Sequence, residues 1–196
     1  PLVVLTKQLQ AALQPQVNEP VEIAMRYQNP SMQEAFDNLI KRVPGLEEVI
    51  AVPLYPHYAM SSYETAVEHA KEVHRKEKYP FTLSFIKPFY NEANYINAMI
   101  ENIRPYLQQD YDQLLFSYHG LPERHMKKAD PTNAHCMKVA NCCQVASPAH
   151  ATCYRHQCRT TTQMITEKLN VPEEKIGFSF QSRSGREEWL KPYTAK

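Results

Sequence analysis

Residues 114–124 read Leu-Leu-Phe-Ser-Tyr-His-Gly-Leu-Pro-Glu-Arg, an apolar run followed by turn residues. The apolar run that begins at Leu114 predicts a strand, and it stops at His119. Gly120 and Pro122 then predict a turn. In an open α/β sheet, ligands bind outside the carboxyl ends of the strands. We therefore interpret His119 as a candidate functional residue, with a satisfied structural histidine as the alternative.

Strand and helix patterns alternate on both sides of this stretch. Apolar runs bounded by turn residues predict strands at 2–5, 21–27, 48–55, 81–86, 113–119 and 175–181. Apolar residues at helical spacing predict helices at 7–13, 31–43, 61–78, 91–107 and 155–169. Ser31, Asn91 and either Ser61 or Ser62 are the expected caps, and Glu34 gives Ser31 the spacing of a capping box. This alternation predicts an α/β fold with mostly parallel sheets and helices on both faces.

The composition excludes several classes of protein. The 196 residues carry a formal charge of +1, so no nucleic-acid partner is expected. No apolar run reaches the roughly 18 residues of a spanning helix, and the first residues do not resemble a secretory signal, so we expect a cytoplasmic protein. A chain that begins on Pro1 inside an apolar run is expected to be part of a longer protein. With only 4 glycines, it shows no Gly-rich phosphate loop.

The five cysteines all fall in one segment, with the spacing Cys-x5-Cys-Cys-x9-Cys-x4-Cys; they are Cys136, Cys142, Cys143, Cys153 and Cys158. Such crowding without a secretion signal indicates a reducing compartment and a metal. Thiolates select zinc, copper or iron–sulfur clusters, and the close C-x2-C pairs typical of zinc sites are missing. Neighbouring side chains in an extended chain point apart, so one of the two adjacent cysteines is surplus to a four-ligand site.

Four motifs resemble those of the ferrochelatases, the enzymes that insert ferrous iron into a porphyrin. They occur in the family's order and are found at 25–30 (MRYQNP), 54–58 (LYPHY), 116–124 (FSYHGLPER) and 180–194 (FQSRSGREEWLKPYT). The resemblance covers nearly the whole chain and matches the middle of the family sequence. It implies two Rossmann-like domains around a porphyrin cleft. Residues 1–108 would form part of the first domain, and 109–196 would begin the second, with a cysteine-rich insertion at 133–158.

The resemblance also implies roles for particular residues. His119 would be the cleft histidine that accepts a proton, binds Fe²⁺, or does both; imidazole suits either task near neutral pH. The implied porphyrin-binding residues are Arg26, Tyr27, Tyr55, His57, Tyr58, Tyr118 and Trp189. His57 stands where many relatives have Gln, which adds a candidate ligand on the metal side. The alternatives are that Arg26 pins a loop and that Trp189 packs in the core.

The same resemblance favours a [2Fe–2S] cluster in the insertion, with Zn²⁺ as the alternative. The expected ligands are Cys136, Cys143, Cys153 and Cys158, with Cys142 as a substitute. His135, His150 or His156 could replace one of them, as in a Rieske centre. The cluster would be structural, or would sense redox state or nitric oxide, because insertion of ferrous iron transfers no electron.

The expected partners are therefore a porphyrin and ferrous iron. Peripheral membrane contact, as in many ferrochelatases, stays open, and no pattern indicates an oligomeric state. The family's partner glutamate lies beyond Thr194, so the isolated chain is expected to be nearly inactive. One competing hypothesis is a non-catalytic α/β module that binds iron–sulfur or zinc. Another is a chelatase for a different tetrapyrrole and metal, although the aromatic residues near Tyr55 and Trp189 favour a flat porphyrin.

Overall fold

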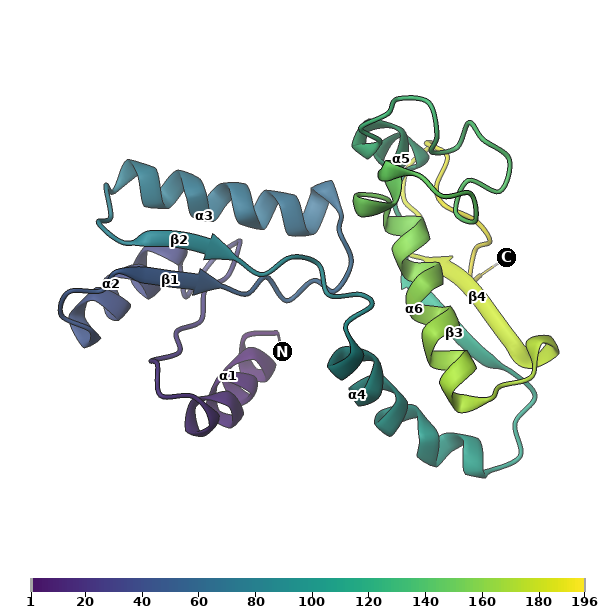
Figure 1. The fold of residues 1–196 in the computed structure, drawn as a ribbon, viewed down its shortest axis with the longest axis horizontal. Coiled ribbons are helices and arrows are strands. Elements are labelled where there is room, and N and C mark those ends of the chain that lie inside the picture. Colours follow the sequence, from purple (N-terminus) through teal and green to yellow (C-terminus); the bar gives the residue numbers. More distant parts are fainter. Residues whose placement is uncertain (1, 196) are drawn as a thin grey trace. The chain divides into compact units, whose positions relative to one another are not determined.

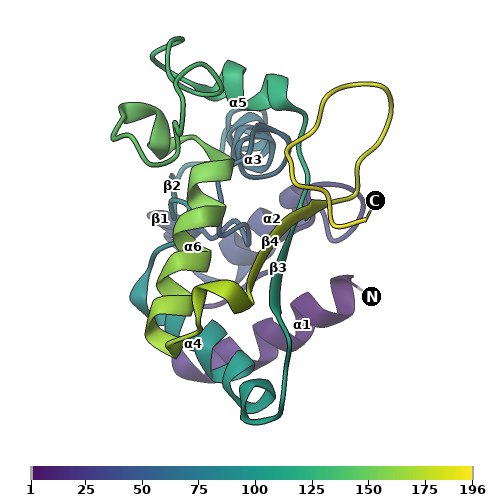
Figure 2. The ribbon, with the colours of Figure 1, turned by 90° about the vertical axis from the view of Figure 1, so that its right-hand side faces the viewer.

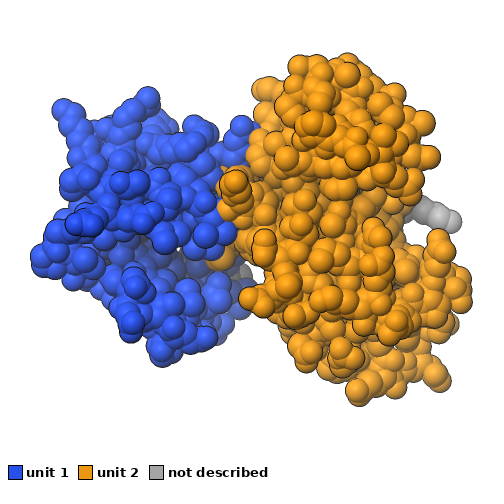
Figure 3. Space-filling model, in the orientation of Figure 1, with its two compact units in different colours: residues 1–53, 64–86 blue, residues 54–63, 87–196 orange. Residues whose placement is uncertain are grey.

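The computed structural model of the chain describes residues 2–195, so the outermost residues of the two predicted domains lie outside it. The chain forms two compact units (Figure 3). Unit 1 comprises residues 1–53 and 64–86, and unit 2 comprises 54–63 and 87–196. The division of the family's domains near residue 108 stays a prediction. No helix within 2–195 has the length and apolar character needed to cross a membrane.

Unit 1 is built on two parallel strands. Its elements are α1 (Leu2–Leu13), α2 (Met32–Arg42), β1 (Glu48–Ala51), α3 (Thr65–Lys76) and β2 (Thr82–Phe85) (Figure 1). β1 and β2 pair so that Val49 lies opposite Leu83. The helices α2 and α3 contact each other, and both pack with the strands around Phe36, Ala70 and Phe81. Burial of this apolar cluster is the main stabilising contribution to the unit.

The predicted capping box at the start of α2 is confirmed. The Ser31 Oγ accepts a hydrogen bond from the Glu34 backbone N–H at 3.2 Å, and the Glu34 carboxylate accepts from the Ser31 N–H at 2.6 Å. Two backbone donors at the helix start, which have no partner inside the helix, are thereby satisfied.

The strand predicted at 2–5 is wrong, because these residues form the first turn of α1. A short apolar run has no periodicity of its own, so it can begin a helix as readily as form a strand. The side chains of α1 remain largely exposed, and Leu2 is 69% exposed.

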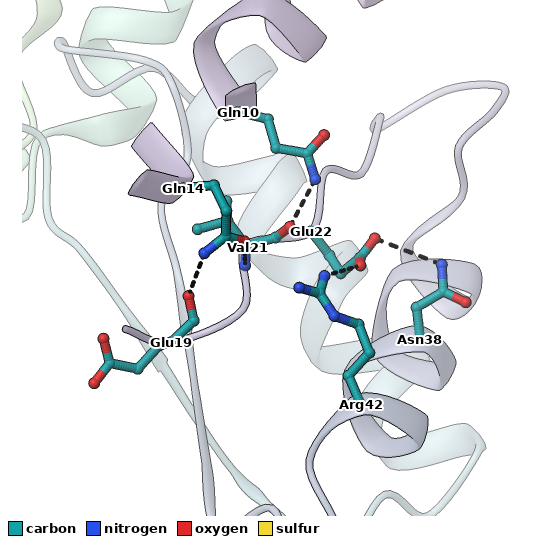
Figure 4. A network of polar contacts seen from close by, with 7 residues as sticks. All are labelled: Gln10, Gln14, Glu19, Val21, Glu22, Asn38 and Arg42. Atoms are coloured by element: carbon teal, nitrogen blue, oxygen red, sulfur yellow. Dashed lines mark hydrogen bonds and ion pairs between the residues drawn. The ribbon is translucent and has the colours of Figure 1, made fainter. Parts of the chain in front are cut away.

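The strand predicted at 21–27 is also wrong, because the segment is irregular and pairs with no strand among residues 2–195. Side chains bind its backbone instead (Figure 4). The Gln10 Nε2 donates to the Val21 carbonyl at 2.6 Å, and the Val21 N–H donates to the Gln14 Oε1 at 2.9 Å. Glu22 forms an ion pair with Arg42 of α2 at 2.6 Å. A segment whose backbone polar groups are satisfied by side chains in this way does not need hydrogen bonds from a neighbouring β-strand.

Three further boundaries differ from expectation. β1 ends at Ala51 rather than near Tyr55. A π-helical turn, Met60–Glu64, precedes α3 and contains both serines that were expected to cap it. The helix predicted from Asn91 begins at Ala93, and no side chain caps it. Residues that favour caps also occur in turns, so their presence alone does not locate a helix start.

Unit 2 places a parallel strand pair against two helices. Its elements are α4 (Ala93–Ile103), β3 (Leu114–His119), α5 (Glu123–Ala129), α6 (Tyr154–Leu169) and β4 (Ile176–Gln181) (Figure 2). β3 and β4 pair in parallel from Leu114 opposite Ile176 to His119 opposite Gln181. α4 packs on α6, and their isoleucines share a core with Phe116. The α/β fold with parallel strands is therefore confirmed, as are the positions of β3, β4 and α6. The short helix α5 was not predicted.

Candidate functional site

His119 ends β3 with an exposed side chain. Exposure alternates along this strand, so Leu115, Ser117 and His119 share an exposed face, whereas Tyr118 points toward α6. The backbone of the histidine is held in place, because its carbonyl accepts a hydrogen bond from the Tyr154 hydroxyl at 3.0 Å. The imidazole therefore stands at the carboxyl end of a parallel strand, on a fixed backbone and open to a ligand.

The turn after His119 pairs with the second long motif. The Gly120 N–H donates to the Gln181 carbonyl at 2.7 Å, and the Leu190 N–H donates to the Leu121 carbonyl at 2.9 Å. A Cβ on Gly120 would lie 2.7 Å from the Gln181 oxygen and 3.3 Å from the Trp189 ring. Only glycine allows so close an approach. The structure therefore brings the 116–124 and 180–194 motifs together at one strand end.

Trp189 is half-buried in this paired block. Its backbone forms a bridge with Pro122, and its indole Nε1 is buried without a hydrogen-bond partner among the described residues. The neighbouring acidic side chains point to solvent: Arg124 pairs with Glu187 at 2.9 Å, and Lys191 pairs with Glu188 at 2.8 Å. The Trp189 ring is thus part of the paired motifs at the end of β3, whereas the two glutamates form ion pairs at the surface.

Tyr118 and His57 lie on the α6 side of the sheet, away from the face that carries His119. The Tyr118 hydroxyl lies 2.8 Å from the Thr162 Oγ1, and burial raises the pKa of this phenol above its ordinary range. The His57 ring packs edge-on against Tyr118, with the ring centroids 5.5 Å apart. The structure therefore does not bring His57 and His119 onto one face of the sheet.

His57 is neutral at physiological pH. Its Nε2 lies 2.9 Å from the Thr161 Oγ1, which itself donates to the Tyr90 carbonyl at 2.7 Å. The single hydroxyl proton of Thr161 is thus used, so the His57 Nε2–H is the donor. Burial lowers the pKa of His57 to about 4. A neutral ring that donates to a helix side chain acts here as a packing residue.

Gln157 is a buried residue of α6 that sequence patterns did not single out. Its Oε1 accepts from the Tyr58 N–H at 2.7 Å, and its Nε2 donates to the Ala151 carbonyl at 2.9 Å. It therefore joins the 54–58 motif to the end of the cysteine segment. Tyr55 in the same motif is 37% exposed. One polar residue in an amphipathic helix usually faces water, so the sequence held no signal for this role.

Arg26 and Tyr27 belong to unit 1 and lie in the irregular segment rather than at the end of a strand. The Arg26 Nε donates to the Thr65 Oγ1 at 2.9 Å, and its guanidinium lies 4.6 Å from the centroid of the Tyr27 ring. Tyr27 is 69% exposed. Arg26 thus pins this segment to the first turn of α3, and the tyrosine ring is open to solvent.

The cysteine segment gathers its thiols beside the first turns of α6. All five cysteines are free, and four are buried: Cys136, Cys142, Cys153 and Cys158. Cys153 lies close enough to Cys136 and Cys143 to act on the pKa of both thiols: it acts to lower that of Cys136, against the larger raising effect of burial, and it raises that of Cys143. Among residues 2–195, no three His, Cys, Asp or Glu side chains are arranged as a metal site. The donor set is nevertheless chemically suited to a thiophilic metal group, because soft thiols converge from three parts of one segment.

Two features at the start of α6 also bear on this fit. Arg155, in the first turn of α6, has a buried Nε without a partner in the described chain, and its guanidinium acts on the Cys143 thiol. A cationic donor of this kind suits an anionic thiolate cluster. Cys153 is the N-cap of α6, so its backbone is fixed by the start of that helix.

Asp130 fixes the start of the cysteine segment. Its buried carboxylate accepts hydrogen bonds from Thr132 and from the backbone N–H groups of His135 and Cys136, both at 2.8 Å. Burial acts to raise the pKa of this carboxyl, but these hydrogen bonds outweigh burial and hold the pKa well below its ordinary value. This anchor was not predicted, although Asp130-Pro131-Thr132 is a recognisable turn signal.

A parallel α/β fold with an exposed strand-end histidine and a paired tryptophan motif is the arrangement of a chelatase-type protein. The family model described as Ferrochelatase matches residues 1–196. The chain belongs to the ferrochelatase family.

Proteins named Ferrochelatase resemble this chain along almost all of its length. That of Pseudomonas fluorescens (strain Pf0-1) is 48% identical over 197 residues, which cover 99% of this chain and 57% of the relative. That of Pseudomonas entomophila (strain L48) is 45% identical over 196 residues, with 99% and 58% coverage. That of Stutzerimonas stutzeri (strain A1501) is 44% identical over 196 residues. The chain thus spans less than two thirds of the length of these relatives.

Proposed function

We propose that the protein inserts ferrous iron into a porphyrin, protoporphyrin IX or coproporphyrin III, in haem biosynthesis. The observation that carries this proposal is the family match over residues 1–196, which includes the exposed histidine at the end of β3. Over the aligned residues, the relatives that bear the name Ferrochelatase are 43–48% identical to this chain. The aromatic residues of the motifs around Tyr55 and Trp189 favour a flat, apolar tetrapyrrole as the substrate.

We assign the proton or metal step to His119. Metal insertion requires two pyrrole protons to leave the macrocycle and requires the ferrous ion to lose most of its water. Neutral imidazole can accept a proton near pH 7 and is also a good ferrous ligand. The exposed ring of His119, on a backbone held by Tyr154, supports this role because the group is accessible and its position is fixed.

We further propose that Trp189, Tyr55, Arg26 and Tyr27 contact the porphyrin. The exposure of Tyr27 and Tyr55 supports direct contact. A guanidinium suits a propionate, although Arg26 would have to keep or exchange its bond to Thr65. Tyr118 and His57 pack toward α6, which favours an indirect role for both, and Tyr58 is held through its backbone by Gln157.

Removal of the His119 imidazole tests the catalytic assignment. In the protein at its full natural length, His119→Ala is expected to slow anaerobic Fe²⁺ insertion by about 100-fold or more, as for loss of a general base. Porphyrin binding, followed by fluorescence quenching, should persist. Leu115→Ala is the matched control because this residue lies on the same exposed face of β3. Undiminished metalation by His119→Ala contradicts the assignment, and a protein that never quenches porphyrin fluorescence is a scaffold rather than a chelatase.

We propose in addition that four cysteines hold a [2Fe–2S] cluster, namely Cys136, Cys143, Cys153 and Cys158, with Cys142 as the substitute. Support comes from the proximity of Cys153 to Cys136 and Cys143 and from the unpartnered Arg155 nitrogen. When bound, such a cluster supplies a one-electron redox centre and a covalent crosslink of the segment. We assign it a structural or sensing role.

The cluster has a direct spectroscopic test. Anaerobically purified protein is expected to be coloured, with charge-transfer bands in the visible range and equal amounts of iron and acid-labile sulfide. A colourless preparation with one zinc ion per chain would favour the zinc alternative and exclude the cluster.

A further inference from the structure

Three histidine side chains surround the peptide groups of the two adjacent cysteines. The Nε2 atoms of His135 and His150 lie 2.7 Å and 2.8 Å from the Cys142 carbonyl oxygen. The Nδ1 of His156 lies 2.9 Å from the Cys143 carbonyl oxygen. These rings also pack on one another: His150 and His156 are stacked with centroids 3.6 Å apart, and His135 meets His150 edge-on at 5.4 Å. We call these three residues the histidine clasp.

The partners define which ring nitrogens carry protons. A carbonyl oxygen can only accept, so each facing nitrogen must be an N–H donor. His135 and His150 are therefore protonated at Nε2, and His156 is protonated at Nδ1. The Cys142 oxygen receives two of these hydrogen bonds, which uses both of its lone pairs. The nitrogens that face the carbonyls are consequently engaged and cannot bind a metal in this arrangement.

Fixing the two carbonyls fixes the directions of the two cysteine side chains. The plane of a peptide group is rigid, so its carbonyl direction limits where the adjoining Cβ atoms can point. Residues 141–144 form a turn, in which the Gln144 N–H donates to the Asn141 carbonyl at 2.7 Å. Adjacent side chains on such a turn leave the backbone in different directions, so the two cysteines do not face one compact group together. Here the Cys143 side chain lies close enough to Cys153 for that neighbour to raise its pKa, whereas Cys142 is buried with its carbonyl held by two rings.

We propose that the histidine clasp consists of positioning residues that direct Cys143, and not Cys142, to the cluster. The inference rests on the [2Fe–2S] cluster proposed above. The clasp works with Asp130, which holds the Cys136 backbone from the other end of the segment. Backbone hydrogen bonds thus choose the ligand between two chemically identical neighbours. Such outer contacts commonly change metal affinity by about 10- to 100-fold when they are removed.

Replacing a histidine by Asn or Gln keeps an N–H donor but removes the imidazole. Such variants distinguish a histidine that positions the backbone from one that binds the metal. Asn places an N–H close to the Nδ1 of histidine, and Gln places one close to the Nε2. His156→Asn and His150→Gln are therefore expected to keep the cluster content and the electron paramagnetic resonance spectrum of the reduced protein. His156→Leu and His150→Leu should release iron to a chelator about tenfold faster or more. These measurements are made on the full-length protein after gel filtration, so that only folded chains are compared.

A second pair of variants tests the choice of ligand itself. Cys142→Ser is expected to retain the cluster, and Cys143→Ser is expected to lose it. In the His150→Leu background, Cys143→Ser should regain a weakly bound cluster with an altered resonance spectrum, because the Cys142 carbonyl then loses one of its two donors and Cys142 can turn inward. A merely structural contribution of the rings would not produce this exchange.

The outcomes separate the clasp from the cluster. If the unaltered protein is colourless, the cluster proposal fails and the clasp fails with it. If the unaltered protein is coloured and both leucine variants match it in iron release and spectrum, only the clasp is overturned. If the amide variants lose iron as fast as the leucine variants, a histidine acts through a ring nitrogen as a ligand, which also contradicts positioning.

Discussion

His57 illustrates how one side chain acquires its role from its surroundings. In the sequence it lies between two tyrosines of a cleft motif, which suggested a ligand on the metal side. In the fold its ring packs against Tyr118 and Tyr154 and donates to Thr161 of α6. Burial lowers its pKa to about 4, so the neutral form belongs to the folded state and protonation opposes folding.

This burial predicts a pH dependence. Because the folded pKa lies below the unfolded value of 6.5, the stabilisation is complete above pH 6.5 and is lost as the pH falls toward 4. His57→Gln retains an N–H donor but removes the titrating group. The difference in unfolding free energy between the two proteins should therefore change by on the order of 3 kcal/mol between pH 7 and pH 4.

Urea unfolding of both proteins at several pH values measures this difference, because the other histidines contribute equally to each. Parallel pH profiles would show that the ring is accessible to protons in the folded state. They would also reopen a direct role for His57 in the site.

At the scale of elements, the contact between the end of β3 and the 180–194 motif depends on a glycine. We call this motif, which contains Trp189, the tryptophan block. Gly120 has no steric room for a Cβ, since the Gln181 oxygen and the Trp189 ring lie within 3.3 Å of where it would stand. Elsewhere in the same sheet, a Cβ on Gly177 would meet the side chains of Leu115 and Gln113, which can move. A Cβ would therefore meet fixed backbone at Gly120 but only movable side chains at Gly177.

Gly120→Ala is expected to push the tryptophan block away from the end of β3. The cost should be about 1–3 kcal/mol of stability, as for other overpacked sites. Trp189 is the only tryptophan, so its fluorescence should shift to the red as the ring becomes wetter.

The matched control is Gly177→Ala, for which we expect a smaller loss of stability and no shift of the emission. An unchanged spectrum in Gly120→Ala would show that the block can move without exposing its ring.

At the scale of the whole molecule, polar contacts buried along α6 join separate segments of unit 2, in addition to its apolar core. The segment 54–63 leaves unit 1 in the chain but packs with unit 2. Gln157 binds this segment through Tyr58 and binds the end of the cysteine segment through Ala151. It lies fully buried, so each bond forms where water cannot replace it.

Gln157→Leu should therefore loosen two segments with one change. Loss of the amide leaves buried backbone groups without this partner, and the expected cost is about 2–3 kcal/mol of unfolding free energy. Hydrogen exchange should show faster exchange at Tyr58 and around residue 151.

Gln163→Leu on the exposed side of the same helix is the control, with an expected change within about 0.5 kcal/mol. Equal stabilities for the two variants would mean that the segments are held by apolar packing alone.

Local signals determined much of the fold. β3, β4 and α6 were predicted from apolar periodicity, and the Ser31–Glu34 box was predicted from its spacing. The errors fell at 2–5 and 21–27, where a short apolar or alternating run fits more than one conformation. At 21–27 the choice was made by side chains of the preceding helical segment, because Gln10 and Gln14 bind the backbone of Val21.

The sequence by itself determined the family, the parallel α/β class, and a histidine at the end of a strand, because each is written in neighbouring residues. Only the tertiary structure decided that Tyr118 and His57 face α6, that the two long motifs pair, and that three histidines hold the Cys142 and Cys143 carbonyls. The physical reason is that the direction of a side chain and the partner of a buried polar group depend on segments far apart in the chain.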